Sequence, residues 1–68
     1  MRKNYTRVIA DEKGFYFREF LDEYGFDFEM YPSRKYATYT DYDILATERE
    51  IEMIDNFITE DLYANYDI

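Results

Sequence analysis

The most regular stretch of the chain is residues 26–31, in which apolar and polar side chains alternate without a break. A strand places successive side chains on opposite faces, so this pattern predicts a strand with one apolar and one polar face. The apolar face carries Phe26, Phe28 and Met30, and the polar face carries Asp27, Glu29 and Tyr31. Residues 5–10 predict an earlier strand because they are rich in β-branched and aromatic side chains, and residues 36–45 predict a return strand after a turn at 32–35.

A first amphipathic helix is predicted between the first two strands. Its apolar positions recur at i, i+3, i+4 and i+7, and they are Phe17, Phe20, Leu21 and Tyr24. Asp11 is expected to cap this helix, and Gly25 stands where a glycine commonly ends one. The alternative is a hairpin with its turn at 11–14 and a second strand at 15–20. The four apolar positions and the terminating glycine favour the helix.

A second helix follows the return strand. Thr47 and Glu50 form the sequence signature of a capping box, in which each side chain accepts a hydrogen bond from the backbone amide of the other residue. The apolar stripe that follows consists of Ile51, Ile54, Phe57, Ile58 and Leu62. Residues 62–68 either extend this helix or supply a last short strand.

The predicted order is therefore β-α-β-β-α, with an optional final strand, over one domain that spans residues 1–68. This is the order of the ferredoxin-like α+β arrangement, in which two helices cover one face of an antiparallel sheet. The fold class hosts many functions, so the prediction of function depends on the surface.

Composition argues against an enzyme. The 68 residues include no Cys and no His, which excludes disulfides, thiolate metal sites and the commonest general base. Asp41-Tyr42-Asp43 is like half of a calcium loop, but the glycine and the terminal glutamate of such a loop are missing. We expect no catalytic residue, no metal and no cofactor. The sequence has neither a signal-peptide pattern nor an apolar run that could span a membrane, and a cytoplasmic location in a bacterial host is expected.

The net charge of −8 is distributed unevenly along the chain. Residues 1–18 carry five basic and two acidic side chains, whereas residues 19–68 carry fourteen acidic and three basic ones. Such a field repels nucleic acid and anionic membranes and attracts basic protein surfaces. The charge also serves solubility, which is the simpler explanation for it.

The predicted partner-binding surface is the sheet face that the helices leave open. Asp is disfavoured in strands, yet Asp41 and Asp43 share one face of the return strand with Tyr39. They are expected to join Asp27, Glu29 and Tyr31 of the neighbouring strand, and a line of acidic residues on the second helix extends the set with Glu48, Glu52 and Asp55. The simpler alternative is an open face that only needs polar residues.

Tyrosine is the second candidate for binding, because it is enriched at interface hot spots. Tyr24 and one of Tyr39 and Tyr42 are expected in the core, and the expected exposed set is Tyr31, Tyr36, Tyr63 and Tyr66.

In size and charge the chain resembles small acidic phage-encoded inhibitors, namely anti-restriction proteins, uracil-DNA glycosylase inhibitors and anti-CRISPR proteins. The resemblance is one of type and assigns no residue. It implies an inhibitor that imitates nucleic acid with rows of Asp and Glu and binds a protein with a basic surface, without binding nucleic acid or a membrane. The alternatives are an immunity protein or antitoxin that neutralises a basic toxin, and a small regulatory module that forms a homodimer.

Overall fold

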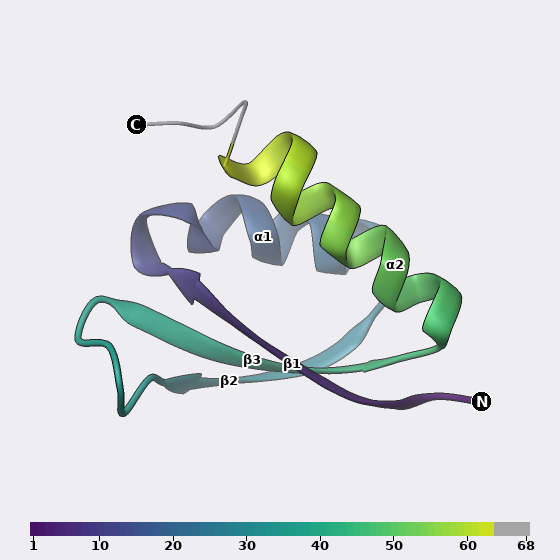
Figure 1. The fold of residues 1–68 in the computed structure, drawn as a ribbon, viewed down its shortest axis with the longest axis horizontal. Helices are drawn as coiled ribbons and strands as arrows, with labels where there is room; N and C mark the ends of the chain where they lie inside the picture. Colours follow the sequence, from purple (N-terminus) through teal and green to yellow (C-terminus); the bar gives the residue numbers. More distant parts are fainter. Residues whose placement is uncertain (64–68) are drawn as a thin grey trace.

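A computed structural model describes residues 1–63 of the chain (Figure 1). Its elements are β1 (Lys3–Ala10), α1 (Asp11–Glu23), β2 (Asp27–Pro32), β3 (Tyr39–Ala46), α2 (Glu48–Asn56) and the π-helix η1 (Phe57–Leu62). The α+β class, the three strands and the two helical segments are as predicted. Of the predicted tail, Leu62 ends η1, and residues 64–68, with Tyr66, lie outside the described residues.

The sheet has β3 at its centre and the order β1-β3-β2, with both neighbours antiparallel to β3. Tyr5 of β1 and Phe28 of β2 both lie beside Ile44, which fixes the register on the two sides. Both helices lie on one side of the sheet, so its other face is left open (Figure 1). The helices contact β1 and β3 more extensively than β2. Met30 of β2 consequently remains 42% exposed although it lies on the predicted inward face.

The core lies between the sheet and the helices. Tyr42 and Ile44 of β3 are fully buried, and Tyr42 meets the ring of Phe17 edge-to-face at 4.9 Å between centroids. The hydroxyl of Tyr42 accepts a hydrogen bond from Arg18 at 3.2 Å, so its polar atom is satisfied inside the core. The other fully buried large side chains are Ile9, Phe17, Leu21, Ile54 and Leu62.

Helix α1 starts one residue earlier than the sequence predicts, because β1 runs directly into it. Ala10 is the N-cap residue, and Asp11 is the first helical residue. The backbone N–H of Asp11 donates to Thr38 O at 2.9 Å, and its carboxylate accepts from the Thr40 hydroxyl at 2.7 Å. Asp11 therefore ties the start of α1 to β3, and the prediction that it caps the helix was wrong.

Gly14 lies in the first turn of α1 because the helix approaches the core closely there. A Cβ atom at this position would lie 2.9 Å from Arg18 Nη1 and 3.1 Å from the Tyr42 hydroxyl. The glycine thus makes room for the hydrogen bond between those two side chains.

The end of α1 explains why Tyr24 is not in the core. Gly25 adopts φ +73°, donates to Asp22 O at 3.1 Å, and is followed by Phe26, whose N–H donates to Leu21 O at 2.9 Å. This pair of bonds is a Schellman motif, which turns the chain so that the residue after the glycine packs back on the helix. Phe26 is therefore buried, while Tyr24 is 57% exposed.

The second helical segment begins as predicted and then changes its geometry. Thr47 and Glu50 form the full capping box, with bonds of 2.8 and 3.2 Å. From Phe57 the α-helix widens into η1, which the apolar stripe did not predict. None of the helices within residues 1–63 combines the length and the apolar character needed to cross a bilayer.

The predicted return strand begins three residues late, at Tyr39. Residues 33–38 form a loop instead, in which Ser33 Oγ accepts from the backbone N–H groups of Lys35 and Tyr36 at 3.3 and 3.2 Å. This local hydrogen bonding competes with strand pairing, so the connection is longer than the turn predicted at 32–35.

Candidate functional site

The open sheet face brings together six of the nine residues predicted to bind a partner. They are Asp27, Glu29 and Tyr31 of β2 and Tyr39, Asp41 and Asp43 of β3. Alternation places these side chains opposite the buried Tyr42 and Ile44, as the sequence predicts. The face is completed by Leu45 and by outward residues of β1 that sequence reasoning did not include, Asn4, Thr6 and Val8.

Two of the carboxylates on this face are directly opposed. Glu29 lies beside Asp43 in the register of β2 and β3, and like charges in such a pair destabilise a sheet. Neutral hydroxyls support both groups: Thr6 donates to Asp43 at 2.5 Å, and Tyr31 donates to Glu29 at 2.6 Å. The hydrogen bond to Glu29, together with the negative charges of Glu29 and Asp43, raises the pKa of Tyr31 above its usual 10.0.

Asp41 differs from Glu29 and Asp43 because one of its carboxylate oxygens is buried and receives no hydrogen bond from a described residue. Among the described residues, its Oδ1 is the one buried side-chain oxygen or nitrogen atom without a hydrogen-bond partner. It lies beside an open hollow of about 440 Å³ that is also lined by Val8, Tyr31 and Tyr36. A buried acceptor without a donor lowers the free energy of unfolding by about 1–3 kcal/mol. The position of this oxygen therefore destabilises the fold.

The strands provide no cation on the open sheet face. In residues 1–63, none of its outward strand positions is Lys or Arg. Arg34 and Lys35 of the 33–38 loop also line the hollow beside Asp41, but neither forms an ion pair with it. Exposed apolar groups also contribute to the surface: Val8 and Leu45 are each 37% exposed, and Tyr31 is 47% exposed.

The three predicted residues of α2 do not extend this surface, because α2 lies on the other side of the sheet (Figure 1). Glu48 pairs with Lys3 at 3.3 Å, and Asp55 pairs with Arg7 at 2.8 Å. Glu52 is exposed on α2. Two of the three carboxylates are therefore bound by basic residues of the protein itself.

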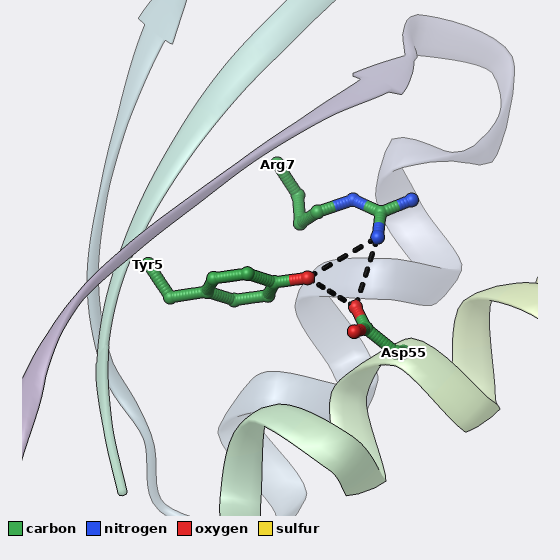
Figure 2. A network of polar contacts seen from close by, with 3 residues as sticks. All are labelled: Tyr5, Arg7 and Asp55. Atoms are coloured by element: carbon green, nitrogen blue, oxygen red, sulfur yellow. Dashed lines mark hydrogen bonds and ion pairs between the residues drawn. The ribbon is translucent and has the colours of Figure 1, made fainter. Parts of the chain in front are cut away.

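Asp55 belongs to a polar network that joins β1 to α2. Figure 2 shows Tyr5 and Arg7 of β1 converging on its carboxylate: Tyr5 donates to Asp55 Oδ1, and Arg7 Nη1 donates to the same oxygen and to the Tyr5 hydroxyl at 3.2 Å. Burial, followed by the hydrogen bond to Asp55, raises the pKa of Tyr5 above its usual 10.0. The hydrogen bond to Tyr5 is the main cause that raises the pKa of Arg7. The network holds Asp55 in a structural role.

For the predicted tyrosines within residues 1–63, exposure follows the prediction except at Tyr24. Tyr42 is the core residue of the pair Tyr39 and Tyr42, and Tyr39 is 37% exposed on the open sheet face. Tyr31, Tyr36 and Tyr63 are exposed as expected. The missed residues Thr6 and Val8 carried a usable signal, since alternation in residues 5–10 places them opposite Tyr5, Arg7 and Ile9.

The carboxylates of the described residues do not converge into a group of three that could hold a metal ion. Comparisons with protein families, with curated proteins and with solved structures find no match to this chain. The site is therefore interpreted from its own geometry and charge.

Proposed function

We propose that this protein is an acidic inhibitor that binds a basic nucleic-acid-binding protein or enzyme through its open sheet face. The rows of carboxylates imitate the charge of a nucleic acid and occupy the basic track that would otherwise hold it. The activity is one of binding without catalysis, and its place is the cytoplasm of a bacterial host.

The observation that carries the proposal is that, within residues 1–63, no basic side chain forms an ion pair with a carboxylate of this face. Asp27, Glu29, Asp41 and Asp43 form no ion pair with a described basic residue. Opposed like charges and an unpartnered buried acceptor both disfavour folding, and a cationic partner would relieve the repulsion between the opposed carboxylates. The carboxylates thus fit a surface whose charge is completed by another molecule.

The spacing of the carboxylates suits a phosphate-binding track. Residues i and i+2 of a strand lie about 6.6–7 Å apart, and neighbouring strands lie about 4.8 Å apart. DNA presents one charge per about 1.7 Å of its axis over two strands, so its binding proteins carry basic side chains along a matching track. A sheet holds its side chains in place before binding, which reduces the ordering cost of association.

Apolar contact is available between the charges. Tyr31 and Tyr39 offer ring surface with one hydroxyl each, a combination that is enriched at binding hot spots. We propose that the three-stranded antiparallel sheet with its two helices belongs to the ferredoxin-like fold class, which by itself favours no function.

The test begins with the immobilised protein and a bacterial lysate at low salt, eluted with a salt gradient. Nucleic-acid-binding proteins are expected in the eluate, and the purified target should bind DNA or RNA competitively with this protein. The competition should weaken steeply as salt rises, because the contacts are ionic. If no nucleic-acid-binding protein elutes, or if nucleic acid and this protein bind the target together, the proposal is wrong.

A further inference from the structure

A second acidic surface lies in the helical layer, on the side of the sheet away from the open sheet face. It is an open groove of about 490 Å³ between α1 and the segment formed by α2 and η1. Tyr16, Glu19, Phe20, Glu23 and Tyr24 line one wall, and Met53, Asn56, Phe57, Glu60 and Asp61 line the other. We call it the interhelical groove.

The interhelical groove contains a cluster of aromatic rings. Phe20 of α1 stacks on Phe57 of η1 with 4.1 Å between ring centroids and 7° between ring planes. Tyr24 lies beside Phe20 at 5.0 Å between centroids, and 57% of its surface is exposed. A large amphipathic ring that is exposed next to an aromatic stack offers a face for a flat or cationic guest.

The charge of the groove is entirely negative. Among its lining residues, all of them within the described part of the chain, Glu19, Glu23, Glu60 and Asp61 are acidic and none is basic. Glu19 and Glu23 are four residues apart on α1, so they repel each other, and they form no ion pair with a described residue. Glu23 is also the last residue of α1, where negative charge opposes the helix dipole. Glutamate is a good helix former, but its charge at these two positions is unfavourable to α1.

The groove also coincides with the irregular part of the second helical segment. Phe57, Glu60 and Asp61 all belong to η1, where the helix has π geometry. Short π segments within α-helices are rare and occur frequently at functional sites. The aromatic cluster, the acidic walls and the π geometry are three different features of one groove.

We propose that the interhelical groove binds arginine side chains of a partner protein. A guanidinium is planar, stacks on aromatic rings and donates two parallel hydrogen bonds to a carboxylate, so it matches both the aromatic cluster and the acidic walls. A lysine ammonium is a more strongly hydrated point charge and matches only the carboxylates. This surface is separate from the open sheet face, and the proposal stands whether or not that face mimics nucleic acid.

The test uses the full 68-residue chain and a short acetylated and amidated peptide with two arginines four residues apart. Amide chemical shifts in a ¹H–¹⁵N spectrum should change at residues 19–24 and 56–61 as the peptide is added. A peptide with citrulline in place of arginine has the same shape without the charge, and it should bind about tenfold more weakly or worse. The lysine peptide should fall between the two.

Two double variants with the same change in net charge locate the site. Glu19→Gln with Glu23→Gln should weaken arginine-peptide binding about tenfold and leave the fold intact, because both side chains are exposed. Glu48→Gln with Glu52→Gln on α2, two exposed carboxylates that are also four residues apart but lie outside the lining of the groove, should leave the affinity within about twofold, since only more distant charge is removed. Tyr24→Ala should reduce the preference for arginine over lysine.

Three results would overturn the proposal. Equal weakening by the two double variants would mean that the peptide responds only to overall charge. Shift changes centred on residues 27–31 and 41–43 would place the peptide on the open sheet face. Equal affinity for the arginine and citrulline peptides would remove the role of the carboxylates.

Discussion

At the junction between β1 and α2, acidic side chains have basic partners from the start of the chain, whereas on the open sheet face four carboxylates have none among the described residues. Glu48 pairs with Lys3 and Asp55 with Arg7, and Glu50 lies 3.9 Å from Arg2. Within residues 1–63, the hydrogen bonds to the opposed pair on the open sheet face come from the neutral hydroxyls of Thr6 and Tyr31. Acidic residues therefore stabilise the fold at the junction, whereas those on the open sheet face have no basic partner among the described residues.

The two-residue period of β1 produces this difference. Lys3, Tyr5 and Arg7 alternate with Asn4, Thr6 and Val8, so the basic residues of β1 lie on the side that the helices cover. The basic residues at the start of the sequence consequently pair with carboxylates of α2 and do not reduce the negative charge of the open sheet face. The described strand positions of that face carry four acidic and no basic side chains, whereas the whole chain has 16 acidic and 8 basic residues.

The largest expected effect comes from reversing charge on the open sheet face. Asp41→Lys with Asp43→Lys should weaken binding to the proposed basic target about a hundredfold or more, because each change replaces an attractive ionic contact by a repulsive one. The unfolding free energy should change little, since a lysine at position 43 would face Glu29 across the strands. Affinity by calorimetry and stability by urea denaturation measure the two quantities.

The matched variant for this experiment lies on α2. Glu48→Lys with Glu52→Lys makes the same change in net charge on the other side of the sheet, and it should weaken target binding only a few-fold through long-range repulsion. If the two double variants weaken binding equally, overall charge and not the open sheet face determines recognition. If the first variant unfolds the protein, the two aspartates serve the fold and the comparison between the regions fails.

A smaller effect is expected from breaking the junction. Asp55→Ala removes the common acceptor of Tyr5 and Arg7 and should lower the unfolding free energy by about 1–2 kcal/mol, less than a fully buried charged network would cost because the site is partly screened by solvent. The side chains of Arg7 and Asp55 are 35% and 42% exposed. Urea denaturation measures the loss, and target binding should stay within about twofold because the contact surface is untouched.

Asp27→Ala on the open sheet face provides the comparison for stability. It removes one carboxylate that faces Leu45 and for which the described residues provide no ion pair, so the unfolding free energy should change by less than about 0.5 kcal/mol. Equal losses for Asp55→Ala and Asp27→Ala would show that the junction is no more structural than the open sheet face.

Sequence reasoning succeeded where one local pattern decides the structure. The alternation in residues 26–31 placed Asp27, Glu29 and Tyr31 on the outer face, and the capping box of Thr47 located the start of α2. It failed where a contact distant in sequence decides. The start of α1 depends on a hydrogen bond from Asp11 to Thr38, and the position of Asp55 depends on which face of the sheet α2 covers.

The candidate site shows the same division. Six of its predicted residues share the open sheet face because a strand period is a local property. The α2 residues could not be assigned from the sequence, since a helix stripe shows which side is buried but not which basic residues the outer side will meet. The π geometry of η1 has no sequence signal here either, because Ile54, Ile58 and Leu62 keep the spacing of an ordinary α-helix.

The smallest expected effect is the pH dependence of the stability that Glu50, a carboxylate of the capping box, contributes to the fold. The hydrogen bond that Glu50 accepts from the backbone N–H of Thr47, with the nearby charge of Arg2, lowers the pKa of Glu50 below its usual 4.5. A carboxyl group whose folded pKa is lowered stabilises the fold above its unfolded pKa and loses that contribution as pH falls through the folded pKa. Urea denaturation from pH 6 down to about pH 3 should therefore show a stability difference between the native protein and Glu50→Gln that shrinks toward acid pH.

The glutamine keeps an acceptor for the Thr47 amide but has no charge to lose, and Glu52→Gln on the same helix controls for net charge. A difference that stays constant over this range would mean that Glu50 acts only as a hydrogen-bond acceptor, and the contrast between structural and unpaired carboxylates would then depend on the ion pairs of Lys3 and Arg7 alone.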